Sequence, residues 1–261
     1  MILERQVIAL EARLRQCRNV ITLGVHTNFS AYPTEDQDRI RKADIIYYPT
    51  TFYADLFDSI GKKTFPSYHT YKCVQDKIKQ TALFELLGIP HPRTRIFYGK
   101  RQQQDILRHF EFPFIAKVAR GSARGRGVFL IRDRAGLERY LDGNPIAYVQ
   151  DYLPIDRDMR VVMIGRRTVH AYWRIAPEGD FRSNVSLGAS ICLDPLPEAA
   201  LQLAAFTART CGWDDVGLDI CQCGGSFYVL EANMKYGREG FRKAGIDYPR
   251  LMETMIERRE I

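Results

Sequence analysis

Apolar residues in the first 65 positions occur in short runs separated by segments with helical spacing. Leu3, Val7, Leu10, Leu14 and Cys17 recur at steps of three and four, which predicts an amphipathic first helix. Strands are then expected at 19–25, 45–48 and 63–65, with helices at 34–42 and 53–60. Strands that alternate with helices in this way predict a small parallel sheet.

Beyond residue 75 the apolar pattern mixes paired strands with helices. A strong helix is expected at 76–87, where Gly88 and the prolines at 90 and 92 would end it. Further strands are expected at 95–98, 114–118, 128–131, 147–152, 159–164 and 168–175, and further helices at 103–110, 137–141, 198–211 and 248–258. Together these elements predict an α+β fold.

The segment 217–237 is predicted to form a hairpin that carries oxygen-bearing side chains. Glu231 and Asn233 are two residues apart, so they project from one face of a strand. Asp219 faces Glu231 if the loop has an odd number of residues, naturally the three from Gly224 to Ser226. Two carboxylates beside a carboxamide suit Mg²⁺ with bound phosphates, although a solvated hairpin with a polar face would show the same pattern.

Composition and charge narrow the class of protein. The 261 residues are 46% hydrophobic and 26% charged, which is typical of a folded soluble chain. No apolar run approaches the ~18 residues of a membrane-spanning helix, and charges interrupt the N-terminus, so neither a membrane anchor nor a signal peptide is expected. A cytoplasmic location is therefore expected. The net charge of +7 is compatible with nucleic acid, phosphorylated ligands or acidic substrates.

The cysteines do not predict a metal site. None of the six stands at a zinc-ligand spacing, and the C-x-C pair at 221–223 has no second pair to complete a site. Reduced thiols are the expected state in a cytosolic chain, with metal binding as the alternative.

A glycine-rich loop follows a strand lysine. Lys117 precedes the segment 121–127, GSARGRG, in which three glycines allow backbone amides to approach an anion. The ending G-K-[ST] of a Walker A motif is absent. Three interpretations stay open: a nucleotide phosphate site, an arginine-glycine RNA contact and a plain flexible hairpin.

Two polar segments further along favour the same kind of site. The strand ending at 150–153, QDYL, offers free backbone groups for an adenine edge, and Asp158 and Arg160 follow on one face of the next strand. Arg174 precedes the segment 178–184, EGDFRSN, whose Arg182 and Asn184 would clamp a phosphoryl group. An exposed ion pair at 158 and 160, and a surface position for Arg174, are the plain alternatives.

Taken together, these segments resemble the ATP-grasp superfamily, and specifically its RimK-like branch, the ribosomal-protein glutamate ligases and their relatives. The resemblance covers about residues 75–257 and rests on QDK at 75–77, LLGIPHPRT, FIAKV, QDYL, D-M-R, EGDFRSN, GLDI and EAN. It implies an ATP-grasp domain over residues 71–261, with a lysine and glycine-loop subdomain at 71–148 and a metal-binding subdomain at 149–261. Residues 1–70 would form the small α/β domain that precedes it.

The resemblance implies roles for individual residues. Lys77 and Lys117 would neutralise the ATP phosphates, Asp151 and Tyr152 would contact the adenine, and Asp158 would lie towards the ribose. The implied ATP-binding residues are Lys77, Lys117, Gly121, Ser122, Gly125, Gly127, Gln150, Asp151, Tyr152, Leu153, Asp158, Arg182, Ser183 and Asn184.

The catalytic and metal roles follow from the same resemblance. Arg174, Arg182 and Asn184 would act on the transferring phosphoryl group. The implied ligands of two Mg²⁺ ions, with Mn²⁺ as an alternative, are Asp219, Glu231 and Asn233. The implied reaction is ATP-dependent ligation, in which a carboxylate is phosphorylated by ATP and an amine then displaces phosphate.

The expected partners are ATP, an amino acid or small carboxylate and an amine or peptide acceptor. A homo-oligomer is left open, and neither a membrane nor nucleic acid is expected. Lys235 and Tyr236 depart from the Pro-Gly that commonly follows E-x-N-x, and so alter a region that usually faces the substrate. A basic group at Lys235, Arg238, Arg242 and Lys243 predicts an acidic substrate such as glutamate, or else is a solvated helix face.

Two alternative functions remain open from the sequence. The altered residues at 235 and 236 are consistent with an ATP-binding sensor or scaffold that has lost ligation. The arginines between 120 and 126 are consistent with RNA binding, which salt would weaken steeply.

Overall fold

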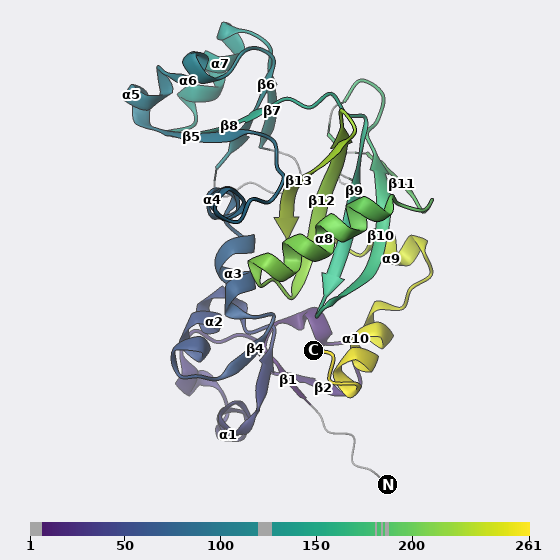
Figure 1. The fold of residues 1–261 in the computed structure, drawn as a ribbon. Helices are drawn as coiled ribbons and strands as arrows, with labels where there is room; N and C mark the ends of the chain where they lie inside the picture. Colours follow the sequence, from purple (N-terminus) through teal and green to yellow (C-terminus); the bar gives the residue numbers. More distant parts are fainter. Residues whose placement is uncertain (1–6, 120–126, 181, 184, 186–187) are drawn as a thin grey trace.

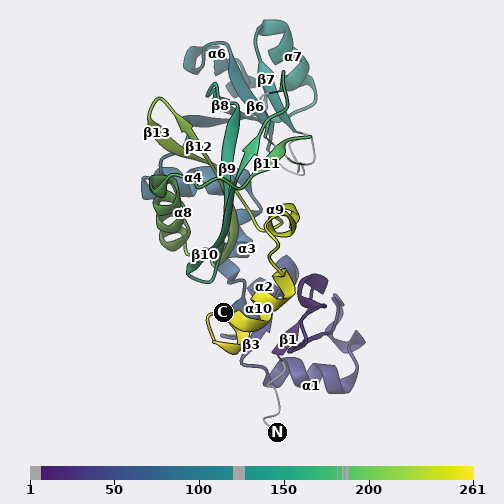
Figure 2. The same cartoon turned by 90° about the vertical axis from the view of Figure 1, so that its right-hand side faces the viewer.

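The structure, a computed structural model, describes residues 7–119, 127–180, 182–183, 185 and 188–261. The strands of this part form sheets of four, five and four strands. Figures 1 and 2 show the three sheets placed one after another along the long axis of the molecule, with the first sheet at one end. No helix in these ranges is both long and apolar enough to span a bilayer.

The first sheet consists of four parallel strands in the order β2-β1-β3-β4, as the alternation of strands and helices predicts. Its elements are β1 (Val7–Ala9), η1 (Ala12–Leu14), β2 (Val20–Thr22), η2 (Phe29–Ala31), α1 (Thr34–Lys42), β3 (Ile45–Tyr47), α2 (Thr50–Ser59) and β4 (Lys63–Phe65).

The predicted amphipathic first helix is wrong over the part that the structure describes. Residues 7–9 form strand β1, and only a 3-10 turn follows at 12–14. Strand β1 pairs with β2 on one side and β3 on the other, so it lies inside the sheet. Leu10 and Leu14 are fully buried, but they fill the core from this strand and turn. Of the apolar residues at helical spacing, only Val7 lies on the strand, and Leu10, Leu14 and Cys17 are buried from the segment that follows it.

Helices α3 (Tyr68–Val74) and α4 (Lys77–Leu87) connect the first sheet to the rest of the chain. Helix α4 was predicted, whereas α3 was not. Asp76 caps α4 by accepting hydrogen bonds from the Ile78 and Lys79 amides at 3.0 and 3.2 Å. Gly88 ends it in the left-handed conformation, with φ of 65°.

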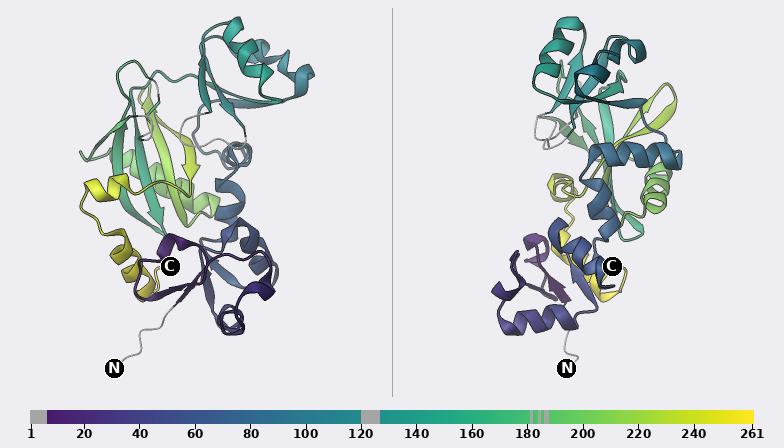
Figure 3. Two further views of the ribbon diagram at one scale, coloured as in Figure 1. Left: turned by 180° about the vertical axis from the view of Figure 1, so that it is seen from behind. Right: turned by 90° about the vertical axis from the view of Figure 1, so that its left-hand side faces the viewer.

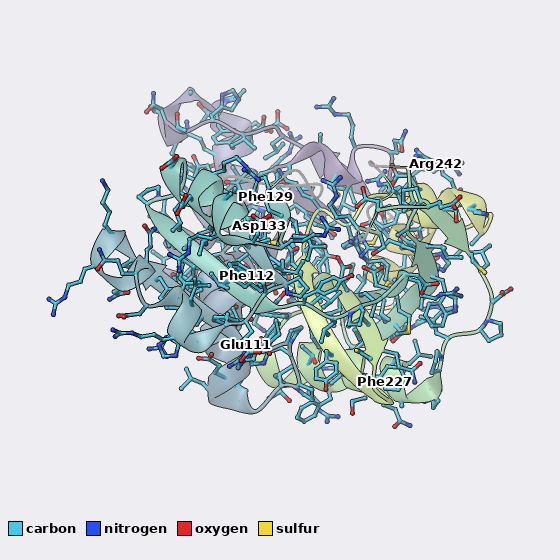
Figure 4. All side chains as sticks on the ribbon, turned by 90° about the horizontal axis from the view of Figure 1, so that it is seen from above. Glu111, Phe112, Phe129, Asp133, Phe227 and Arg242 are labelled. Atoms are coloured by element: carbon cyan, nitrogen blue, oxygen red, sulfur yellow. The ribbon has the colours of Figure 1, made fainter. Side chains whose placement is uncertain are left out.

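The smaller antiparallel sheet has the order β5-β8-β6-β7. Its elements are β5 (Thr94–Tyr98), α5 (Gly99–Gln103), α6 (Ile106–His109), β6 (Phe114–Val118), β7 (Val128–Ile131), α7 (Arg134–Asp142) and β8 (Ile146–Asp151). The single helix predicted at 103–110 is two short helices. Figure 4 labels Phe112 and Phe129 in this part of the molecule, and Phe227 on the neighbouring sheet.

The third sheet is antiparallel, in the order β11-β10-β9-β12-β13. Its strands are β9 (Arg157–Ile164), β10 (Arg167–Ile175), β11 (Ser190–Cys192), β12 (Asp215–Cys223) and β13 (Ser226–Asn233). Helix α8 (Glu198–Cys211) packs on one face, where Ala200, Ala204 and Ala208 join the core.

The chain then returns to the first sheet. Helix α9 (Glu239–Lys243) leads to α10 (Tyr248–Glu257). Met252, Met255 and Ile256 of α10 share one buried cluster with Tyr47 of β3 and Ile164 of β9. Figure 3 shows α10 beside the first sheet. The last helix therefore joins the first and third sheets.

The hairpin β12–β13 has the predicted pairing near its open end but a different loop. Asp219 pairs with Glu231, as expected, and Gly217 pairs with Asn233. The loop holds two residues, Gly224 and Gly225, with φ of 57° and 79°, instead of the expected three. A bulge between Asp219 and Ile220 shifts the register by one residue. The bulge therefore restores the cross-strand pairing that an odd loop was expected to supply.

Candidate active site

A pocket of about 110 Å³ lies between the smaller antiparallel sheet and the third sheet. Its lining combines one buried lysine, two arginines and four carboxylates with apolar side chains. The predicted site residues that line it are Lys117, Gln150, Asp151, Tyr152, Leu153, Asp158, Arg174, Arg182, Ser183, Asp219 and Glu231. Residues that are far apart in the sequence are therefore brought to one cavity, as ligand sites between subdomains require.

Asp219 lies between two arginines at the floor of the pocket. Arg160 Nη2 donates to its carboxylate at 3.0 Å, and Arg174 Nη2 lies 2.9 Å from the same carboxylate. Burial alone would raise the pKa of Asp219, but the positive charges of Arg160 and Arg174 outweigh it and hold the pKa below its ordinary value. Asp219 therefore stays ionised in the folded protein.

The same network contains Asp158. Arg174 donates to its carboxylate at 2.7 and 2.5 Å, and the Ser183 hydroxyl donates at 2.5 Å. Asp158, Arg160 and Arg174 are all buried, so the alternatives of an exposed ion pair and a surface arginine are wrong. The sequence pattern places Arg160 on one face of a strand with Asp158 but assigns it no role. Its place on β9, opposite Asp219 of β12, depends on strand pairing that the sequence pattern does not specify.

Lys77, Lys117 and Glu231 line one small cavity. Lys77 Nζ lies 3.0 Å from Glu231 Oε1, and Lys117 is buried above the Tyr148 ring at 5.5 Å. Burial lowers the pKa of Lys117 to about 8, since the nearby Glu231 carboxylate offsets only part of the loss of hydration. A predicted phosphate-binding lysine and a predicted metal ligand are thus an ion pair in this structure.

At the other edge of the pocket, the side chains of Gln150 and Asp151 already form hydrogen bonds within the protein. Arg93 donates two hydrogen bonds to the Asp151 carboxylate, from Nη2 at 2.8 Å and from Nε at 3.0 Å. The Gln150 amide is buried and donates to Thr94 Oγ1 at 2.8 Å. A base bound at this edge would therefore meet the side chains of Tyr152 and Leu153 and the backbone. The adenine role of Asp151 stays a prediction.

Of the remaining predicted site residues, some are described by the structure and others are not. Arg182 donates to the Asp180 carboxylate at 2.8 to 3.2 Å and is partly exposed, and Gly127 accepts from the Val118 amide at 2.8 Å. Gly121, Ser122, Gly125 and Asn184 lie outside the residues that the structure describes.

Asn233 ends β13 directly opposite Gly217 and is half-buried. A Cβ at Gly217 would lie 2.5 Å from the Tyr236 Cβ, so this glycine makes room for Tyr236. The Tyr236 side chain is buried and donates to Asp215 at 2.7 Å. The expectation that Tyr236 alters the substrate-facing surface is therefore wrong, whereas Lys235 is exposed.

The donor set of the hairpin suits a divalent cation. Asp219 and Glu231 are cross-strand neighbours, and Asn233 follows on the face of Glu231. Carboxylate and amide oxygens are the ligands that Mg²⁺ prefers. The described residues contain no cluster of three His, Cys, Asp or Glu side chains that could hold a metal alone. The amide of Asn233 and the oxygens of a bound phosphate would have to complete the coordination shell.

Comparisons with known proteins identify relatives of this chain. The family model described as RimK-like ATP-grasp domain matches residues 74–256. The ribosomal protein bS6–L-glutamate ligase of Escherichia fergusonii is 30% identical over 220 residues, which cover 80% of this chain and 73% of that protein. The β-citrylglutamate synthase B of Danio rerio is 36% identical over 179 residues, which cover 65% of this chain and 44% of that protein.

A solved structure shares the fold over nearly the whole chain. The RimK domain ATP-grasp protein from Sphaerobacter thermophilus superposes with a TM-score of 0.70 at 16% identity. The superposition covers 95% of this chain and 98% of that protein. Because the identity is low, this likeness concerns the fold.

Proposed function

This chain belongs to the RimK-like ATP-grasp family, and on that premise we propose that it joins an amino acid to a carboxylate-bearing acceptor through an acyl-phosphate. It is an ATP-dependent ligase that forms C–N bonds, as its relatives are. We further propose glutamate as the first amino acid to test, because the similar bacterial proteins are named for it. The observation that carries the proposal is the meeting of Lys117, Asp219 and Glu231 around one pocket, with Lys77 paired to Glu231.

The chain's own groups account for the electrostatic demands of the reaction. ATP carries several negative charges, which Lys117 and Arg174 would face from opposite sides of the pocket. Lys77 would move from Glu231 to a phosphate oxygen when ATP binds, because both anions compete for the same ammonium group. No nucleophilic side chain is needed, since positioning and charge neutralisation drive phosphoryl transfer.

ATP-grasp ligases use ATP with divalent metal ions, and Asp219, Glu231 and Asn233 would hold the metal here. A divalent cation held by these oxygens would supply positive charge that neutralises the transferring phosphoryl group. We propose two Mg²⁺ ions, with Mn²⁺ able to replace them. Binding would free Lys77 from Glu231, which connects metal binding to phosphate binding.

The basic residues beyond β13 do not form one pocket. Arg238 donates to the Arg13 carbonyl at 2.8 Å and covers the Tyr248 ring. Lys243 donates to the Ile191 carbonyl at 2.5 Å. Arg242 lies on α9 at the molecular surface (Figure 4). Lys235 is exposed and has no hydrogen bond or salt bridge to the residues that the structure describes, and we propose that it faces the substrate.

The first experiment is a screen for ADP release with Mg²⁺-ATP. Each of the twenty L-amino acids is paired with small carboxylates and with peptides that end in glutamate. We expect ADP and phosphate with at least one pair, and no AMP. Asp219→Asn should abolish turnover, because it removes a charge that both the metal and the two arginines need.

The matched control is Asp38→Asn, which changes an exposed aspartate on α1. It should keep the turnover of the unaltered chain. Release of AMP, or undiminished turnover in the Asp219 variant, would contradict the proposal. Circular dichroism should show that both variants keep the fold.

A further inference from the structure

The free edge of the hairpin β12–β13 is covered by the side chain of Gln80 on α4. Strand β13 is the last strand of its sheet in the described part of the chain, so no neighbouring strand pairs with its outer edge. Gln80 Oε1 accepts from the Ala232 amide at 2.9 Å, and Gln80 Nε2 donates to the Ala232 carbonyl at 2.9 Å. Its Nε2 also donates to the Val74 carbonyl of α3 at 2.6 Å. One side-chain amide therefore joins β13 to two helices.

These hydrogen bonds act on the backbone between the proposed metal ligands. Ala232 lies between Glu231 and Asn233, and it is fully buried in the core on the opposite face of the strand. Its amide belongs to the peptide unit shared with Glu231, and its carbonyl to the peptide unit shared with Asn233. Gln80 thus fixes one peptide unit beside each proposed ligand. This requires a side chain that both donates and accepts, as a glutamine amide does.

The same turn of α4 carries Lys77. Lys77 and Gln80 are three residues apart, so they project from one side of the helix. Lys77 Nζ lies 3.0 Å from Glu231 Oε1, in the residue before Ala232. Gln80 is only 3% exposed, so water cannot readily replace its hydrogen bonds. The contact of Gln80 with Ala232 therefore also sets the position of Lys77 relative to Glu231.

The next residue, Thr81, connects α4 to the smaller antiparallel sheet. Thr81 Oγ1 lies 2.8 Å from the Tyr148 hydroxyl of β8, and both residues are buried. Lys117 Nζ lies 5.5 Å from the centre of the Tyr148 ring. Figure 1 shows α4 end-on, next to β13 and below the smaller sheet. Two neighbouring residues of one helix therefore contact both sides of the cavity that Lys117 and Glu231 line.

We propose that Gln80 and Thr81 are positioning residues for phosphoryl transfer. Gln80 aligns the proposed metal ligands of β13, and Thr81 holds Tyr148 beneath Lys117. This inference rests on the proposed ligase function, and it names the contacts that fix the metal ligands relative to the phosphate-binding lysine. Both residues act through the groups that they hold, as the hydrogen-bond partners of metal ligands do in general.

The first test measures Mn²⁺ binding by electron paramagnetic resonance, with a non-hydrolysable ATP analogue present. Gln80→Met removes all three hydrogen bonds and keeps a side chain of similar length, and we expect the Mn²⁺ affinity to fall about tenfold or more. The matched control is Gln103→Met, which removes a buried amide that donates to the Asn144 carbonyl at 2.9 Å. It should leave the affinity unchanged. Equal Mn²⁺ affinity in the two variants would overturn the role of Gln80.

Hydrogen exchange gives a readout at the contact itself. The Ala232 amide should exchange faster in Gln80→Met, because it loses its acceptor, and at an unchanged rate in Gln103→Met. If circular dichroism shows that Gln80→Met does not fold, Gln80→Asn takes its place. Its amide is one methylene shorter and cannot keep both hydrogen bonds to Ala232, so the same loss of Mn²⁺ affinity is expected.

Thr81→Val tests the contact with the smaller sheet. It removes only the hydroxyl, and calorimetry should show that the ATP analogue binds about fivefold more weakly. The KM for the amino acid should not change. Thr254→Val is the control, because it removes a hydroxyl that donates to the Arg250 carbonyl at 2.9 Å on α10. Unchanged binding of the analogue to Thr81→Val would overturn the role of Thr81.

Turnover separates this proposal from the proposed ligation. ADP release with unchanged Mn²⁺ and nucleotide affinities in Gln80→Met and Thr81→Val would overturn the positioning role and leave the ligation intact. Weaker Mn²⁺ binding in Gln80→Met, in a chain that releases no ADP with any substrate pair, would support the positioning role and contradict the ligation. If the unaltered chain binds neither Mn²⁺ nor the ATP analogue, both are overturned.

Discussion

At the scale of single residues, the site depends on carboxylates that are neutralised by protein cations. Asp219 is bound by Arg160 and Arg174, and Glu231 by Lys77. Arg160 also donates to the Tyr236 carbonyl at 2.9 Å. It therefore orients Asp219 and fixes the segment after β13 at the same time. Buried charges of this kind are tolerated only when each has its partner.

Arg160→Met tests this dependence. Removing one member of a buried ion pair leaves the other charge uncompensated, so we expect the free energy of unfolding to fall by about 3–5 kcal/mol. Urea denaturation measures the change. The control is Arg157→Met on the same strand, whose exposed pair with Asp156 should cost less than about 1 kcal/mol. Equal effects of the two substitutions would contradict the role of burial.

At the scale of elements, the hairpin β12–β13 sets the geometry of the proposed metal ligands. Its two-residue glycine loop defines one register, and the bulge beside Asp219 changes it by one residue before the open end. Without the bulge Asp219 and Glu231 would not be opposite each other. Gly217, at the open end, leaves the space that Tyr236 and Arg160 fill. The bulge beside Asp219 and the absence of a side chain at Gly217 thus give the hairpin its shape.

Gly217→Ala should disturb this packing. The new methyl group would lie 2.5 Å from the Tyr236 Cβ and 3.1 Å from the Arg160 Cδ. Overpacking of this kind costs about 1–3 kcal/mol, and we expect that loss in thermal or urea unfolding. Gly143→Ala is the control, because a Cβ there meets nothing within 4 Å, and its effect should stay within about 0.5 kcal/mol. A neutral Gly217→Ala would show that Tyr236 can move freely.

At the scale of the whole molecule, a buried polar cluster joins the first sheet to the third. Asp215 accepts hydrogen bonds from the Tyr48 hydroxyl at 2.9 Å and the Tyr236 hydroxyl at 2.7 Å. The Arg13 guanidinium lies 4.6 Å from the centre of the Tyr236 ring and 5.3 Å from that of Tyr48. Residues from both ends of the chain therefore share one cluster, which holds the first sheet against the segment that follows β13.

Tyr236→Phe should weaken this connection. It removes one donor from a fully buried carboxylate, and an unsatisfied buried group costs about 1–3 kcal/mol. Scanning calorimetry should show a lower unfolding temperature than that of the unaltered chain. Tyr98→Phe, at an exposed tyrosine, should leave the temperature nearly unchanged. If both substitutions behave alike, the cluster does not hold the two sheets together.

The sequence by itself determined the local elements and the order of the chemical motifs. The period of two places Glu231 and Asn233 on one face, the glycines mark the turn, and the cap and C-terminal glycine delimit α4. These signals are readable because each depends on neighbours within a few residues. They also explain why the pattern does not predict the first strand, since three residues are too few to separate a strand from a helix.

Only the tertiary structure decided which charges meet. The pairs of Asp219 with Arg160 and of Lys77 with Glu231 are contacts between elements that are far apart in the sequence. The bulge beside Asp219 and the buried position of Tyr236 likewise follow from how the sheets pack. No local pattern encodes them, because these side chains meet only when whole elements pack together. That packing depends on burial and hydrogen bonds between residues far apart in the sequence.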